Sequence, residues 1–202
     1  MTDMKNLDQM QLDLLKELAN IGVGNAVTSL SQMLQDRKIT MSIPEVTVEA
    51  LQDLPDLLGG AETPVAGVYL EAEGDISLVI LFVLTLPSVE NLIRFLIPGW
   101  AGEPDELSLS ALKEVGNIIT GSYLNAISFM TGLTFKPSPP SLSVDMAGAI
   151  IATVIAEARI VDDYLLLLRA TLKTDKEEIK GNVLIMPDYG TLKKIFSLLG
   201  VN

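Results

Sequence analysis

Two short stretches of this sequence carry the same polar residues at the same spacing. DLLKELAN begins at residue 13 and SALKEVGN begins at residue 110. In each stretch a glutamate follows an Asp or Ser by four residues, and an asparagine follows the glutamate by three. A carboxylate can accept hydrogen bonds from a cation, and an amide can both donate to and accept from a water molecule. The two sets are Asp13, Glu17 and Asn20, and Ser110, Glu114 and Asn117.

Both stretches have the pattern of an amphipathic helix. Steps of four and seven residues return to nearly the same direction around an α-helix, so each polar set shares one helix face. Packing has no need of an exposed glutamate and asparagine, so their repetition favours a functional role over an ordinary solvated face. The opposite face is apolar, with Leu14, Leu15, Leu18 and Ile21 in the first copy and Leu112, Val115, Ile118 and Ile119 in the second.

Two structural alternatives remain open for these side chains. Asn20 and Asn117 would also fit a buried contact between helices, where each amide satisfies a polar neighbour. Glu17 and Glu114 would also fit ion pairs with a nearby Lys or Arg, which contribute little on a protein surface.

The composition excludes several kinds of chemistry. The 202 residues include no Cys and no His, which removes thiol nucleophiles, disulfides, the usual zinc sites and histidine acid–base catalysis. The net charge of −12 argues against nucleic acid or an anionic membrane surface as a partner. The N-terminal MTDMKNLDQM lacks the apolar core of a signal peptide, and the apolar runs are too short to span a bilayer. We therefore expect a cytoplasmic protein that needs no metal.

The first half of the chain predicts a helix, a strand, an ambiguous segment, a β-hairpin and a short helix. Pro44 indicates that the first strand lies at a sheet edge or has a bulge. Gly74 and Asp75 form the tight turn of the hairpin. The continuously apolar second strand of the hairpin is typical of a strand covered on both faces. The ranges are 7–35 for the helix, 39–48 for the strand, 49–58 for the ambiguous segment, 65–73 and 76–85 for the hairpin, and 88–97 for the short helix.

The second half repeats this order. We expect Ser108 to cap its long helix and Asp145 to cap its middle helix, and Pro187 to open the terminal helix. The helices are expected at 107–131, 145–158 and from Pro187 to about Gly200, the strand at 133–144, and the hairpin strands at 164–174 and 181–186.

The duplication predicts one domain, residues 1–202, built from two repeats at about 7–100 and 105–202. Strands joined by tight hairpins are antiparallel. The expected fold is therefore a pseudo-twofold duplicated α/β sandwich with a largely antiparallel sheet. Gly22, Gly24 and Gly121 indicate close helix packing, which would make the two long helices neighbours.

The doubled motif resembles the signature of the CheC/CheX/FliY family of chemotaxis phosphatases, and two copies in one chain favour its CheC branch. That signature is Asp or Ser, Glu, Asn and then a proline some twenty residues later. Here the prolines are Pro44 and Pro139, although Pro140 fits the second copy equally well. Pro44 lies further from its asparagine than Pro139 does, so the prolines match less closely than the Glu–Asn pairs.

The resemblance implies a phosphatase that hydrolyses the aspartyl phosphate of the response regulator CheY in bacterial or archaeal chemotaxis. Asn20 and Asn117 would orient the attacking water, and Glu17 and Glu114 would bind the lysine of CheY. Asp13, Ser110 and the two prolines would be auxiliary. The receiver domain of CheY would supply Mg²⁺, so this chain would need no cofactor of its own.

The resemblance also implies a second partner, the receptor deamidase CheD. The candidate surface is the predicted helix beginning at Asp145, with Met146, Ala147 and Gly148. An internal pseudo-dimer lessens the need for a homodimer, so a monomer is expected. The alternatives are a binding module that sequesters CheD or phosphorylated CheY, a flagellar-switch component of the FliY type, and an inert scaffold. A FliY-like chain is expected to carry a further C-terminal domain.

Overall fold

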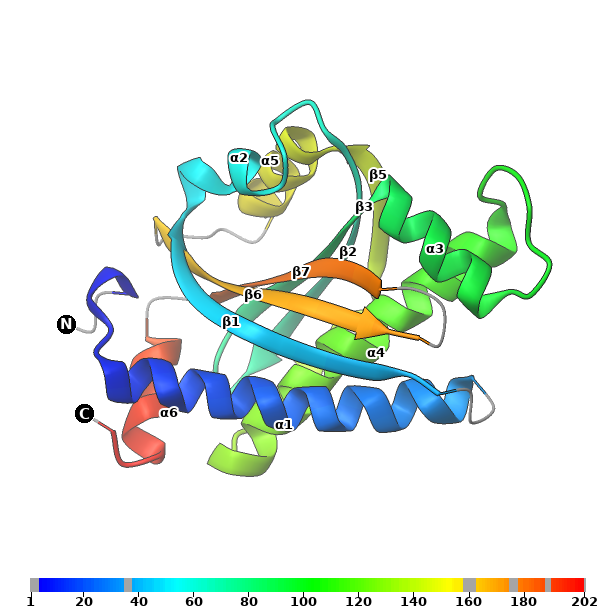
Figure 1. The fold of residues 1–202 in the computed structure, drawn as a ribbon. Coiled ribbons are helices and arrows are strands. Elements are labelled where there is room, and N and C mark those ends of the chain that lie inside the picture. Colours follow the sequence, from blue (N-terminus) through cyan, green and yellow to red (C-terminus); the bar gives the residue numbers. More distant parts are fainter. Residues whose placement is uncertain (1–3, 35–37, 158–162, 175–177, 188–189, 202) are drawn as a thin grey trace.

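An antiparallel sheet runs through both halves of the chain in the computed structural model, which describes residues 4–34, 38–157, 163–174, 178–187 and 190–201 (Figure 1). Among these residues the sheet has seven strands in the order β1-β6-β7-β3-β2-β4, and β5 also pairs with β2. Every pairing is antiparallel. The strands are β1 (Thr40–Ala50), β2 (Pro64–Gly74), β3 (Leu78–Thr85), β4 (Phe135–Pro137), β5 (Ser141–Met146), β6 (Tyr164–Lys173) and β7 (Glu178–Pro187).

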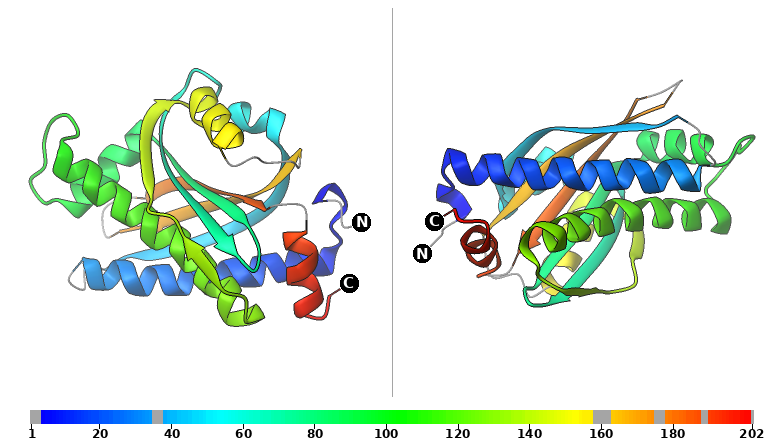
Figure 2. Two further views of the ribbon diagram at one scale, coloured as in Figure 1. Left: turned by 180° about the vertical axis from the view of Figure 1, so that it is seen from behind. Right: turned by 90° about the horizontal axis from the view of Figure 1, so that it is seen from below.

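Two long helices lie side by side against one face of this sheet and run in opposite directions (Figure 2). They are α1 (Gln9–Met33) and α4 (Glu106–Thr131). Two shorter helices pack against the same hydrophobic cluster, namely α3 (Leu86–Leu96) and α6 (Thr191–Leu198). The other face of the sheet is covered in part by α2 (Leu54–Leu57) and α5 (Ala147–Glu157). Short 3-10 turns stand at Met4–Asn6 and Leu51–Asp53.

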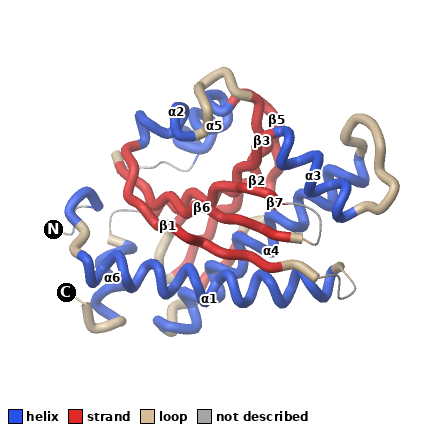
Figure 3. Tube along the Cα trace, viewed as in Figure 1, coloured by secondary structure: helices blue, strands red, loops and turns tan. Residues whose placement is uncertain are grey.

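The order of elements repeats, as the duplication predicted. Each half runs helix, edge strand, short helix, hairpin and helix (Figure 3). The two hairpins, β2–β3 and β6–β7, meet where β3 pairs with β7 at the centre of the sheet. The edge positions are also equivalent, because among the described strands β1 pairs only with β6 while β4 and β5 pair only with β2. The prediction of a duplicated antiparallel α/β fold with neighbouring long helices is confirmed.

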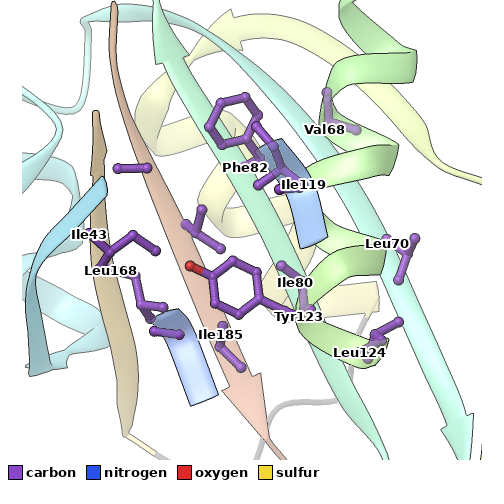
Figure 4. Close-up of a cluster of buried hydrophobic side chains, with 14 of the residues drawn as sticks. Ile43, Val68, Leu70, Ile80, Phe82, Ile119, Tyr123, Leu124, Leu168 and Ile185 are labelled. Carbon is purple, nitrogen blue, oxygen red and sulfur yellow. The ribbon is translucent and has the colours of Figure 1, made fainter. Parts of the chain in front are cut away.

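The main hydrophobic cluster lies between the sheet and α1 and α4, and both halves contribute to it. Figure 4 shows its centre, where Ile119 and Tyr123 of α4 lie over Ile80 and Phe82 of β3. Strand β3 is buried at every residue except Thr85, which confirms that both of its faces are covered. The long helices are therefore fixed to the sheet by one face each, and the opposite faces are left for solvent.

The first half of the chain matches the predicted elements closely except at the hairpin turn. The last pair between β2 and β3 is Ala72 with Leu78, so the connection is longer than the tight turn predicted at Gly74 and Asp75. Pro44 lies in an edge strand, and the register of β1 shifts between Ser42 and Glu45, as a strand proline requires. Gly74 ends β2 with φ 154°, where an added Cβ would meet the carbonyl oxygen of Thr134. The ambiguous segment forms the 3-10 turn and α2.

Five expectations for the second half were wrong. The expected strand at 133–144 is broken into β4 and β5 by the Pro-Ser-Pro-Pro segment. Asp145 and Met146 end β5 rather than opening a helix, because their backbone pairs with β2. Strand β7 begins at Glu178, inside the expected loop, and it ends with Pro187, so α6 starts only at Thr191. Residue 158, the expected end of the middle helix, lies outside the described residues.

The fifth correction concerns the start of α4. Asp105 is the N-cap, and its carboxylate accepts the main-chain N–H of Ser108 at 2.9 Å. Ser108 is the third helical residue, and its hydroxyl accepts the main-chain N–H of Asp105 at 2.7 Å. Helix α1 begins with the same reciprocal arrangement between Asp8 and Gln11.

Candidate functional site

The first polar set lies on the solvent face of α1. The reciprocal cap at Asp8 fixes where the helix starts, and the buried stripe that includes Leu15, Leu18 and Gly22 fixes which face packs inward. Asp13, Glu17 and Asn20 are all exposed. The buried-amide alternative therefore fails for Asn20.

The second polar set occupies the equivalent face of α4. Ser110 and Glu114 are exposed, whereas Asn117 is half-buried. The residue before it, Gly116, lies directly against the sheet. A Cβ added to it would lie 2.5 Å from the side chain of Val68, so only glycine allows this approach. This close approach of α4 to the sheet leaves the side chain of Asn117 less exposed to solvent than that of Asn20.

The key side chains are not engaged within the described parts of the chain. None of Glu17, Asn20, Glu114 and Asn117 makes a side-chain hydrogen bond or an ion pair there. The ion-pair alternative for the two glutamates therefore finds no support among these residues. Asp13 differs, since its carboxylate accepts a hydrogen bond of 2.8 Å from the amide of Gln9. The free carboxylates and amides can bind an incoming cation and a water molecule.

A groove of about 340 Å³ runs beside Asn117. Asn117, Gly121, Asn125 and Ser128 line it from α4, and Ser29 contributes from α1. Phe135 and Pro137 of β4 also line the groove.

The proline that lines this groove is not one of the two prolines that the motif named. Pro137 lines the groove beside Asn117, whereas Pro139 is exposed and is not among the lining residues. Sequence reasoning missed Pro137, although it is another proline of the same short segment. Pro44 lies in β1, at the shift in register.

The two sets lie on opposite sides of the helix crossing. Gly22 packs against α4, where an added Cβ would lie 3.3 Å from the ring of Tyr123. Asn20 precedes this contact on α1, and Asn117 precedes it on α4. Because the helices are antiparallel (Figure 2), the two amides are displaced from this contact in opposite directions. At 1.5 Å per residue, Asn20 lies about 3 Å from the contact along α1 and Asn117 lies about 9 Å from it along α4.

The predicted CheD surface is only partly available. Asp145 and Met146 are exposed at the end of β5, an edge strand, and the carboxylate of Asp145 accepts the N–H of Met146 at 2.7 Å. Ala147 is fully buried, and Gly148 packs on Ala61, to whose carbonyl it donates a hydrogen bond of 2.9 Å. A partner on this surface would therefore meet the first two side chains and not the next two.

Neither a metal-binding cluster nor a membrane-spanning helix occurs in the described part of the chain. These residues contain no group of three or more acidic side chains placed to hold a metal ion. Among the same residues, no helix is both long enough and apolar enough to cross a bilayer.

This fold and these sites define a duplicated α/β protein with two surface Glu–Asn sets on paired helices. The chain belongs to the CheC-like family, as a relative that is 34% identical over the full length shows. The family model matches residues 10–48 and 107–144, which contain both polar sets.

A curated relative matches over the full length. It is the CheY-P phosphatase CheC of Bacillus subtilis (strain 168), which is 34% identical over 213 aligned residues covering 100% of each chain.

Solved structures support the fold. FliY of Thermotoga maritima has a TM-score of 0.75 at 20% identity, over 96% of this chain and 98% of that one. A chain of the CheX–CheY–BeF3–Mg²⁺ complex from Borrelia burgdorferi has a TM-score of 0.51 at 16% identity, over 83% of this chain and 96% of that one.

Proposed function

We propose that this chain is a phosphatase that hydrolyses the aspartyl phosphate of a CheY-type response regulator. The observation that carries the proposal is the pair of Glu–Asn sets on the outer faces of α1 and α4, whose side chains make no hydrogen bond or ion pair within the described parts of the chain. The full-length relative at 34% identity, a CheY-P phosphatase, supports the same activity.

The chemistry needs little from this chain. Hydrolysis of a phosphoryl group requires a water placed in line with phosphorus and stabilisation of the charge on the transferring group. The receiver domain supplies Mg²⁺ and a lysine beside its phosphate, so neither has to come from the phosphatase. A helper that contributes one water-orienting amide and one docking carboxylate is sufficient, and a chain without His or Cys can provide both.

Each side chain then has a separate role. The amides of Asn20 and Asn117 hold the attacking water by donating one hydrogen bond and accepting another. Glu17 and Glu114 accept a charge-assisted hydrogen bond from the receiver's lysine and fix the register of the helix on the receiver. Asp13, Ser110, Pro44 and Pro139 keep an auxiliary role, and Pro137 joins them because it lines the groove beside Asn117.

The test is phosphate release from the phosphorylated regulator with Mg²⁺ present. Asn20→Ala combined with Asn117→Ala should abolish the acceleration while the regulator still binds, because only the water-holding amides are lost. Each single change should remove the contribution of its own site. The matched control is Asn25→Ala, an exposed asparagine of α1 outside the polar set, which should keep full activity.

A non-catalytic binding module is the competing function. If the wild-type chain binds the phosphorylated regulator without accelerating phosphate release, or if the double variant keeps the acceleration, the water-positioning roles fail. A sequestering role would then take their place.

We also propose CheD as a second partner, on the surface formed by Asp145 and Met146. The exposed edge of β5 and its terminal carboxylate support this choice. Asp145→Lys should weaken the affinity for CheD at least tenfold by reversing the charge and should leave phosphate release unchanged. Equal affinity in a binding titration would reject the assignment. The chain is proposed to act in the cytoplasm as a monomer.

A further inference from the structure

Each long helix exposes one large apolar side chain seven residues before its glutamate. Met10 precedes Glu17, and Leu107 precedes Glu114. Both apolar residues are 64% exposed. The match lies in position and exposure rather than in residue type, since one is methionine and the other leucine.

The fold does not account for these two side chains. Each is the second residue of its helix, and the capping hydrogen bonds are made by Asp8 with Gln11 and by Asp105 with Ser108. Neither Met10 nor Leu107 belongs to either hydrophobic cluster formed by the residues that the structure describes. Single exposed apolar residues are common on proteins. The same exposed position in two repeats with different residues is better explained by a shared contact.

Helix geometry places each apolar side chain in line with its site. Seven residues are nearly two turns, so Met10 and Glu17 point in almost the same direction, about 10 Å apart. Asn20 lies about 5 Å further along the same helix. The same spacing holds for Leu107, Glu114 and Asn117. A partner seated over the glutamate and asparagine would therefore also cover the apolar side chain.

We propose that Met10 and Leu107 are apolar anchors for the response regulator, one at each site, an inference that rests on the proposed function. The occupant is the phosphorylated receiver domain, because each anchor continues the polar stripe that faces the receiver's phosphate. Apolar side chains buried at an interface contribute much of its binding energy, whereas rim charges contribute little. The anchors lie too far from the amides to touch the reacting atoms, so they are positioning residues.

The first measurement separates binding from chemistry at each site. Phosphate release is followed at increasing regulator concentration in two backgrounds, Asn117→Ala, which leaves the first site active, and Asn20→Ala, which leaves the second. Met10→Ala should raise KM about five- to tenfold in the first background, and Leu107→Ala should do so in the second, as expected for loss of an interface anchor. In each case kcat should change by less than about twofold.

Control variants exclude a structural effect. Met10→Leu and Leu107→Met should keep the KM of their backgrounds, because they preserve apolar volume. Leu57→Ala removes another exposed leucine, 36% exposed on α2, and should change neither parameter. Thermal unfolding midpoints should match the wild-type value, since the anchors are exposed.

Several outcomes would overturn the proposal. Unchanged KM, a loss confined to kcat, or equal KM increases for both variants in both backgrounds would each do so. If the wild-type chain does not accelerate phosphate release, the proposed function fails, and the anchors are judged by binding alone. A beryllofluoride-loaded regulator with Mg²⁺ should then bind Met10→Ala plus Leu107→Ala at least fivefold more weakly than wild type. Equal affinity, or no binding to either, would reject the anchors.

Discussion

Gly116 shows how a single residue can set the depth of a site. It lies one residue before Asn117, where α4 touches β2, and its missing side chain allows the helix to approach Val68. The sequence predicted close packing at three other glycines, namely Gly22, Gly24 and Gly121. Gly22 does pack closely against α4, but Gly24 and Gly121 have no atom within 4 Å of an added Cβ, so their predicted packing role is wrong.

Gly116→Ala should therefore destabilise the protein. The added methyl group would overlap the side chain of Val68 at 2.5 Å, and overpacking of this kind costs roughly 1–3 kcal/mol. Chemical denaturation of wild type and variant gives the free energy of unfolding. Gly24→Ala is the matched control, because it lies in a helix with open space around it and should gain up to about 1 kcal/mol. A Gly116→Ala variant as stable as Gly24→Ala would contradict the close approach.

At the scale of the elements, the two long helices begin in the same way. Asp8 and Asp105 both cap their helices, and each is followed by a third helical residue that returns the hydrogen bond. These caps fix where each helix starts. They therefore also fix the positions of the apolar anchor and of the polar residues along the helix. The hydrogen bonds that Ser108 donates hold the pKa of the Asp105 carboxyl below its ordinary value.

The lowered pKa of Asp105 predicts a pH-dependent stability. A carboxyl whose pKa falls on folding contributes stability above its unfolded pKa of about 3.9 and loses it as pH falls through the folded value. Asp105→Ala should lower the unfolding midpoint at pH 7, and its deficit from wild type should shrink below about pH 4. Asp105→Asn should lose less at pH 7, because asparagine also caps helices. An Asp105→Ala deficit that stays constant from pH 7 to pH 3 would show that the charge is not involved.

At the scale of the whole molecule, both junctions between the repeats are extensive. Strand β3 pairs with β7 from Leu78 to Leu84, and α1 packs against α4. The main cluster contains buried residues from both repeats on the same side of the sheet. Each repeat therefore completes the core of the other, and the single domain predicted from the sequence can be tested by separating the repeats.

Separate repeats should not fold as monomers. In a chain of residues 1–102, one edge of β3 would be exposed and α1 would lose its packing partner. The free energy lost with this buried surface should exceed the small free energy of unfolding that native proteins have. Nuclear magnetic resonance spectra and sedimentation of this fragment are the measurements. Mixing it with residues 103–202 should restore dispersed spectra. A folded monomeric fragment would contradict the single-domain prediction.

The sequence alone determined which residues are polar and repeated, and how each helix orients them. A helix of period 3.6 places Glu17 beside Asn20 and Glu114 beside Asn117 without reference to any other element. It also determined the duplicated order of helices and strands, because apolar periodicity and turn residues are local signals. The absence of Cys and His restricts the chemistry in any fold that the chain could adopt, because it depends on composition alone.

Only the tertiary structure decided what surrounds those residues. Backbone pairing with β2 made Asp145 and Met146 the end of a strand, although the local pattern favoured the start of a helix there. Contact with Val68 distinguished Gly116 from the other helical glycines, and the course of β4 placed Pro137 in the groove beside Asn117. These features depend on residues far apart in the chain, whose contacts arise from packing and sheet register rather than from local sequence.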